Sequence, residues 1–125
     1  MTDANKKILI VEDELSLRNA LRDKLTHEGF SVLEAKNGEE GLEAALREHP
    51  DIILLDIIMP VMDGATMLNK LRHDPWGTKV AVIILTNLSE AEDSLMRSRG
   101  SLDYIVKSNW KIEDVVAKIR ERLGK

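Results

Sequence analysis

The sequence predicts an α/β protein in which a parallel sheet is covered by helices on both faces. Short apolar runs, suited to buried strands, alternate five times with stretches whose apolar residues recur every three or four positions. Such strands need helices on each side of the sheet, and right-handed crossovers between parallel strands place them there. The length of 125 residues suits a single domain of this kind, residues 1–125, with no output domain in the chain.

The first two strand and helix pairs occupy residues 7–48. The apolar run KILIV at 7–11 predicts the first strand, and residues 31–35 predict the second. Gly29 is expected to stop the helix between them, and His49 with Pro50 ends the helix at about 38–48. The apolar face of the first helix is predicted to contain Leu17, Ala20, Leu21 and Leu25, and that of the second Leu42, Ala45 and Leu46.

The remaining three pairs follow the same pattern. Strands are predicted at 51–56, at 80–85 and at 102–106, and the run at 80–85 is the longest β-branched one. A loop with Pro60 and Gly64 precedes the third helix, and a capping box of Ser89 and Glu92 begins a fourth that ends near Gly100. The inward residues are predicted to be Met67, Leu68 and Leu71 in the third helix and Ile112, Val115, Val116, Ile119 and Leu123 in the last.

Composition excludes several classes of protein. A formal net charge of -4 argues against direct nucleic-acid binding, which needs a clustered basic surface. The chain has no cysteine, so disulfides and thiolate metal sites are impossible. No secretory leader and no apolar run of about 20 residues is present, so we expect a cytoplasmic protein without a membrane segment.

Acidic residues stand where two of the predicted strands end. Glu12 and Asp13 follow the first strand, and Asp56 closes the third. Ligands of open parallel sheets bind beside the carboxyl ends of the strands, so these acids are expected to lie together if the two strands are neighbours. Their mutual repulsion favours a bound divalent cation, and oxygen ligands favour Mg²⁺, with Mn²⁺ as a substitute; ligand type alone does not separate Mg²⁺ from Ca²⁺.

Two more polar residues end strands at this edge. Thr86 follows the fourth strand with a hydroxyl donor, and Lys107 follows the fifth with an ammonium group. Together they would hold an anion beside the metal. With that charge neutralised, the Asp56 carboxylate could act as a nucleophile and form an aspartyl phosphate.

Four motifs resemble those of response-regulator receiver domains, in the same order and spacing. They are ILIVED at 8–13, DIIMP at 56–60 with DG at 63–64, ILT at 84–86 and LDYIVK at 102–107. The resemblance covers nearly the whole chain. It implies a flavodoxin-like (βα)5 three-layer sandwich with strand order 2-1-3-4-5, an order for which a chemotaxis receiver is a standard illustration.

The resemblance also implies a role for each site residue. Asp56 would be phosphorylated by a histidine kinase or a histidine phosphotransfer protein, and the fold itself would catalyse only its own phosphorylation and dephosphorylation. Asp13 and Asp56 would bind Mg²⁺ directly, Glu12 through water, and Ile58 through its carbonyl. Thr86 and Lys107 would contact the phosphoryl group, and the rotamer of Tyr104 would follow Thr86.

The implied output is a changed protein-interaction surface. Phosphorylation would favour one arrangement of the loop after the fourth strand. By resemblance, a downstream target protein would then bind the surface at residues 90–99, 102–106 and 112–123.

Several positions depart from the family pattern. Ser108 follows Lys107 where the family commonly has a proline, so a trans bond or local strain is expected there. Asn87 stands where a small residue is usual, and Ile58 and Leu88 are apolar where many relatives carry a polar group. We hypothesise slow autodephosphorylation, which a phosphoryl lifetime of seconds would disprove.

Three other functions are alternatives to this one. A phosphorylation-independent pseudo-receiver shares the fold, and Ser108 and Asn87 keep that alternative open. A haloacid-dehalogenase-like phosphatase expects a second acid two residues after the nucleophile, where this chain has Ile58. A flavodoxin expects a Ser/Thr/Gly phosphate loop after the first strand, where this chain has acids.

The imidazoles of His27, His49 and His73 are assigned no role. Asp63 is expected to cap its turn, and Trp76 and Trp110 to pack at an edge.

Overall fold

A computed structural model of the chain describes residues 6–56, 61–86, 103–106 and 111–123, with the backbone alone for Thr86 and 103–106. In the described residues strands and helices alternate from β1 to β4, as the sequence predicts, and β5 is followed by α5. The elements are β1 (Lys7–Val11), α1 (Leu15–His27), β2 (Ser31–Ala35), α2 (Gly38–Glu48), β3 (Ile52–Asp56), α3 (Gly64–Arg72), β4 (Ala81–Thr86), β5 (Asp103–Val106) and α5 (Ile112–Arg122).

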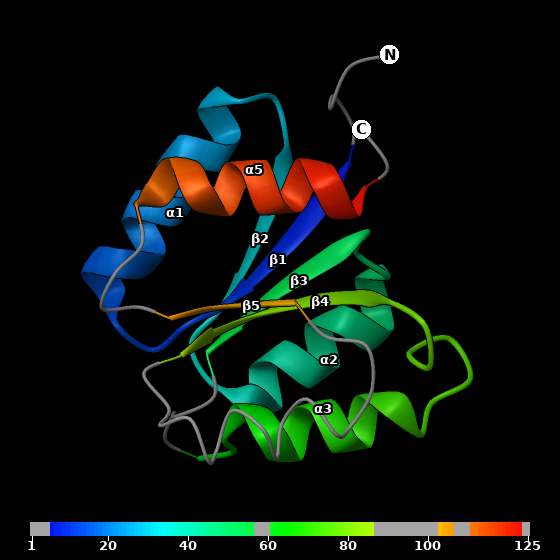
Figure 1. Cartoon of the computed structure of the whole chain (residues 1–125). Coiled ribbons are helices and arrows are strands. Elements are labelled where there is room, and N and C mark those ends of the chain that lie inside the picture. The colour runs from blue at the N-terminus through cyan, green and yellow to red at the C-terminus, as the bar shows by residue number, and fades with distance from the viewer. Residues whose placement is uncertain (1–5, 57–60, 87–102, 107–110, 124–125) are drawn as a thin grey trace.

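The strands form one parallel sheet in the order β2-β1-β3-β4-β5, which confirms the predicted order. Helices α1 and α5 lie on one face of this sheet, and α2 and α3 lie on the other (Figure 1). Helix α1 contacts β1 and β2, and α2 contacts the same two strands from the other face and packs against α3. The result is the three-layer sandwich that the resemblance implies, in which strand ends of β1 and β3 are neighbours.

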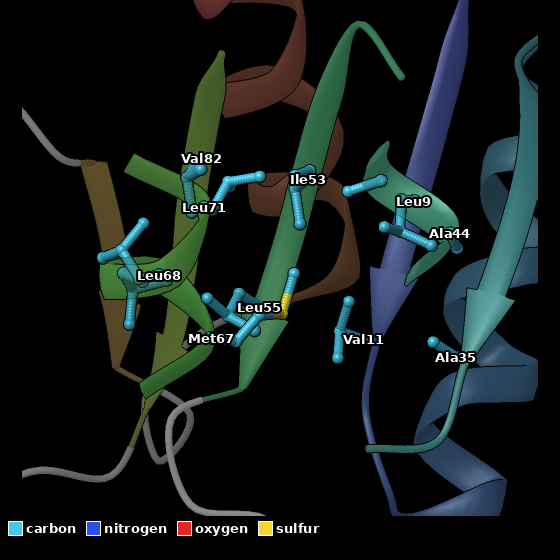
Figure 2. Close-up of a cluster of buried hydrophobic side chains, with 12 residues drawn as sticks. Leu9, Val11, Ala35, Ala44, Ile53, Leu55, Met67, Leu68, Leu71 and Val82 are labelled. Atoms are coloured by element: carbon cyan, nitrogen blue, oxygen red, sulfur yellow. The ribbon is translucent and has the colours of Figure 1, made fainter. Parts of the chain in front are cut away.

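Both faces of the sheet are buried, and alternate residues of each strand serve opposite cores. In β1, Leu9 and Val11 belong to the core beneath α2 and α3, whereas Ile8 and Ile10 belong to the core beneath α1 and α5. Figure 2 shows the first of these cores, in which Met67, Leu68 and Leu71 of α3 meet side chains from the three central strands. This two-sided burial explains why the strands are uninterrupted apolar runs.

Local hydrogen bonds determine where several helices begin and end. The Asn37 side chain accepts from the Glu40 N–H at 2.9 Å, and Asp63 accepts from the Thr66 N–H at 2.8 Å, which confirms that Asp63 caps its turn. Gly29 follows α1 with a φ of 101°, a left-handed conformation that glycine adopts without strain. His49 ends α2 in the same region, with a φ of 49°.

Some predicted details are wrong. Ala20 is exposed, so the buried residues of α1 are Leu21 and Leu25, with Leu17 partly buried against them. Leu46 of α2 is 37% exposed, whereas Ala45 is buried as predicted, together with Gly38, Gly41 and Ala44. In α2 the buried positions are glycines and alanines, because a helix lying close to a strand leaves little room for leucine, whereas α1 buries leucines.

The other differences are small. Asp51 precedes β3, where its carboxylate accepts from the Lys7 N–H at 2.7 Å. His49, which was given no role, stacks on Trp76 with ring centroids 4.3 Å apart, so Trp76 packs at an edge as predicted. The predicted helix at 89–99 and the 107–108 peptide lie outside the described residues. Within the part of the chain that is described, no helix is long and apolar enough to cross a bilayer.

Candidate functional site

Three carboxylates meet at the carboxyl edge of the sheet. Glu12 and Asp13 follow β1 directly, and Asp56 is the last residue of the neighbouring β3. One carboxylate oxygen from each lies within 4.8 Å of the other two. Glu12 and Asp56 are buried, with 0% and 5% exposure, whereas Asp13 is exposed. The structure thus brings together the acids that the sequence predicted to be neighbours.

Backbone contacts hold Glu12 at the point where the chain leaves the sheet. Its N–H donates to the Ala35 carbonyl of β2 at 3.0 Å, which extends the β1–β2 ladder by one residue. Its side chain accepts from the Glu14 N–H at 3.1 Å. Its carbonyl accepts from Nη1 of Arg18 at 2.9 Å. Glu12 is therefore held in position by β2, by its own loop and by α1.

The charge of this cluster suits a hard divalent cation. Two carboxylates at such separations repel by roughly 3 to 4 kcal/mol at an effective dielectric constant near 20. A cation that accepts oxygen ligands relieves this repulsion, and carboxylate oxygens are the ligands that Mg²⁺ prefers. The donor set formed by Glu12, Asp13 and Asp56 fits that ion.

The described residues just before α3, 61–63, are anchored to the start of α2. The Met62 carbonyl accepts from the Gly38 N–H at 2.9 Å. Val61, just before it, has a φ of 68°, a left-handed conformation that β-branched residues rarely adopt. Ile58, the predicted carbonyl ligand, lies outside the described residues, as does Lys107.

Thr86 and Tyr104 are placed by their backbones. Thr86 ends β4, one residue beyond Leu85, the register partner of Asp56. Tyr104 lies on β5, paired with Ile84. Thr86 is therefore at the same edge of the sheet as the acids, on the strand next to β3.

Arg18 contacts this site and was not predicted from the sequence. This residue lies in the first turn and a half of α1, five residues after Asp13, and four residues before Arg22. Both arginines form ion pairs with Glu34 of β2. Their spacing puts them on one helix face, but nothing in the local pattern indicates that this face points toward the carboxyl edge.

Comparison with known proteins agrees with this arrangement. The sequence matches the response regulator receiver domain family over residues 8–120. The chain belongs to this family. As a receiver domain it is a signalling module of a two-component system. Its membership also rules against the phosphatase and flavodoxin alternatives.

Curated relatives of this receiver domain are longer proteins. It is 38% identical over 119 residues to a probable transcriptional regulator, ycf27, of Porphyridium aerugineum, a match covering 94% of this chain and 48% of the relative. It is 37% identical over 115 residues to response regulator ArlR of Staphylococcus aureus, covering 91% and 51%. The chain spans about half the length of these relatives.

Solved structures resemble the whole domain. The receiver domain of a Francisella response regulator is 27% identical, with a TM-score of 0.85 and coverage of 95% and 97% of the two chains. The receiver domain of a Pseudomonas aeruginosa sensor histidine kinase is 26% identical, with a TM-score of 0.86 and coverage of 98% and 100%. That structure has a magnesium ion coordinated in its active-site cleft.

Proposed function

We propose that Asp56 is the phosphoacceptor of this receiver domain. The observation that supports the proposal most directly is the carboxylate cluster itself. Asp56 lies at the buried end of β3, within 4.8 Å of two further carboxylates that can share a cation with it. The strand IILLD holds it firmly, because every residue of β3 is buried.

The proposed reaction is phosphoryl transfer from a phosphohistidine of a kinase or phosphotransfer protein. A carboxylate oxygen of Asp56 attacks phosphorus, and the bond between phosphorus and the histidine nitrogen breaks. The electron pair of that bond leaves with the imidazole nitrogen, and the product is an aspartyl phosphate. Catalysis here is mostly positioning and charge neutralisation, which the protein supplies around one nucleophile.

We assign the metal to the acidic cluster. Asp13 and Asp56 would bind Mg²⁺ directly, with Glu12 acting through water and the Ile58 carbonyl as a further ligand. Mn²⁺ could take the place of Mg²⁺. When bound, Mg²⁺ would supply the positive charge that offsets both the carboxylates and the incoming phosphoryl oxygens. The buried state of Glu12 and Asp56 supports this assignment, since buried carboxylates favour a nearby cation.

The remaining predicted residues would bind the phosphoryl group or respond to its binding. We propose that the Thr86 hydroxyl and the Lys107 ammonium contact its oxygens, and that the Tyr104 side chain follows Thr86. Better contacts in one arrangement of the loop after β4 would shift the population toward it. A target protein would then recognise the surface at residues 90–99, 102–106 and 112–123. We place this signalling in the cytoplasm, through protein contacts and not nucleic acid.

Acetyl phosphate with Mg²⁺ tests the proposal, followed by intact-mass spectrometry. The parent is expected to gain one acid-labile phosphoryl group, and Asp56→Asn is expected to gain none. Omitting Mg²⁺ should abolish the adduct in the parent. A parent that stays unmodified under these conditions would favour the phosphorylation-independent pseudo-receiver.

A further inference from the structure

Arg18 connects the acidic edge to the rest of the domain. Its side chain is only 16% exposed, and its guanidinium uses two different nitrogens. Nη1 donates to the Glu12 carbonyl at 2.9 Å, and Nε donates to the Glu34 carboxylate of β2 at 3.3 Å. The rigid planar fork of arginine makes both contacts at once, which a lysine ammonium on a flexible stem does less well.

The carbonyl that Arg18 holds belongs to the peptide linking Glu12 to Asp13. On the other side of Glu12, the N–H is bound to the Ala35 carbonyl at 3.0 Å. The Glu12 backbone is therefore held at both of its polar groups, one by β2 and one by α1. This peptide leads directly into Asp13. The contact with Arg18 therefore fixes the position of the Asp13 backbone, from which the exposed carboxylate side chain extends.

We propose that Arg18 is a positioning residue for the metal site. It aligns the Glu12–Asp13 peptide so that the carboxylate of Asp13 faces those of Glu12 and Asp56. The Glu34 carboxylate, in turn, orients the guanidinium. The inference rests on the proposed metal-dependent function of this cluster, but the hydrogen bonds that carry it are independent of any phosphoryl group.

Arg22 provides a matched control. It lies one helical turn further along α1, and its Nη1 is 3.5 Å from the same Glu34 carboxylate. Its other ion pair is with the adjacent Asp23 at 3.1 Å. Arg22→Met therefore removes a cation and an ion pair to β2 from the same helix, without removing the donor to the Glu12 carbonyl.

The experiment compares the parent, Arg18→Met, Arg18→Lys and Arg22→Met by NMR, using Mg²⁺ alone as the ligand. Groups that orient metal ligands typically change affinity by about 10- to 100-fold, so Arg18→Met should weaken Mg²⁺ binding by about tenfold or more. Arg18→Lys should fall between the parent and Arg18→Met, and Arg22→Met should match the parent. If Arg18→Met does not fold, Arg18→Lys provides the same comparison.

A second readout needs neither metal nor phosphate. The Glu14 N–H donates to the Glu12 carboxylate at 3.1 Å, so loosening the Glu12 peptide should expose it to exchange. Its hydrogen exchange is expected to be about tenfold faster in Arg18→Met, equivalent to one charge-assisted hydrogen bond, and unchanged in Arg22→Met.

The outcomes separate the two claims. Equal exchange and equal Mg²⁺ affinity in Arg18→Met and Arg22→Met would overturn the role of Arg18, even if the parent accepts a phosphoryl group on Asp56. A parent that binds no Mg²⁺ would instead contradict the proposed metal site. In that case unchanged Glu14 exchange in Arg18→Met would overturn the positioning claim separately, and faster exchange would support it for the peptide alone.

Discussion

At the scale of single residues, Val61 holds an unfavourable backbone conformation in the segment that precedes α3. Its φ of 68° lies in the left-handed region, and its side chain is 77% exposed, so little burial compensates for the strain. A non-glycine residue held in such a conformation costs about 1 to 3 kcal/mol. The conformation of Val61 is therefore maintained at some expense of stability.

Val61→Gly is expected to stabilise the protein. Glycine adopts the left-handed region freely but loses more entropy on folding, so we expect a net gain of about 1 kcal/mol in the free energy of unfolding. Urea denaturation of the two proteins measures it. Val61→Ala keeps most of the left-handed penalty and should gain less. A glycine variant less stable than the parent would show that the conformation is not strained.

Asp13→Asn tests the charge balance of the cluster. In metal-free buffer its Tm should be no lower than that of the parent, because one of three mutually repelling carboxylates is removed. Mg²⁺ should stabilise the parent by binding to the folded state. At 100 times its Kd it should add about 2.7 kcal/mol to the free energy of unfolding, which raises the Tm.

Most of this Mg²⁺-dependent increase should be absent in Asp13→Asn, measured by thermal unfolding with and without Mg²⁺. Glu43→Gln, at an exposed position of α2, is the control and should keep the full increase. Equal increases in Asp13→Asn and the parent would place the ion elsewhere.

At the scale of elements, the start of α2 is packed against the loop between β3 and α3. A Cβ added at Gly38 would lie 2.3 Å from the Met62 carbonyl oxygen, which is backbone and cannot rotate away. The same residue donates its N–H to that oxygen at 2.9 Å. Only glycine allows this close approach, so α2 directly supports the backbone at Met62 and Asp63.

Gly38→Ala is expected to destabilise the domain by about 1 to 3 kcal/mol, as overpacking typically does, although alanine favours helices more than glycine. Chemical denaturation measures the loss. Glu43→Ala, at an exposed position of the same helix, should change stability little. A stable Gly38→Ala protein would mean that the loop moves away without cost.

Helices α1 and α5 are joined by an ion pair at the end of α1. Nη2 of Arg120 donates to the Glu28 carboxylate at 2.9 Å, and Lys24 lies 3.4 Å from its other oxygen. The hydrogen bond from Arg120, followed by that from Lys24, holds the pKa of Glu28 below its ordinary value. A lowered carboxyl pKa stabilises the folded state above the ordinary pKa, and this contribution is lost as the pH falls through the lowered value.

The Tm difference between the parent and Glu28→Gln should therefore be largest at neutral pH and vanish in acid. Thermal unfolding over that pH range measures it. Glu121→Gln, which breaks an i,i+3 pair within α5, should give a smaller difference. A Tm difference for Glu28→Gln that persists unchanged in acid would exclude titration of this pair as its cause.

At the scale of the whole molecule, the sheet connects the acidic edge to α5. Asp56 pairs in register with Leu85 of β4, and Leu85 belongs to the same core as Val115 and Ile119 of α5. β4 in turn pairs with β5. A change in the position of the β4 end can therefore reach α5 by direct packing and β5 by strand pairing.

Beryllofluoride with Mg²⁺ is expected to alter NMR shifts on β4, β5 and α5 more than on α2, because α2 contacts the opposite core. The same titration of Asp56→Asn should produce no such changes. Shifts confined to residues 12–14 and 56–62 would contradict coupling across the sheet and favour an interaction module that does not switch.

Much of this fold was predictable from sequence because its signals are local. The apolar runs and helical periods depend on neighbours within one turn, so the element types agree with the structure and their ends differ by a residue or two. Ala20 and Leu46 were assigned to the wrong faces for a related reason. A period defines a stripe of residues, but the rotation of the helix against the sheet depends on what it packs on.

The sequence by itself determined the alternation of elements, the two-sided core and the presence of acids at the ends of β1 and β3. Only the tertiary structure decided how those acids are held. The contacts of Arg18 with Glu12 and Glu34, and of Gly38 with Met62, join residues 6, 16 and 24 positions apart. Such contacts depend on the angle at which helices cross the sheet, and that angle is an outcome of packing the whole chain.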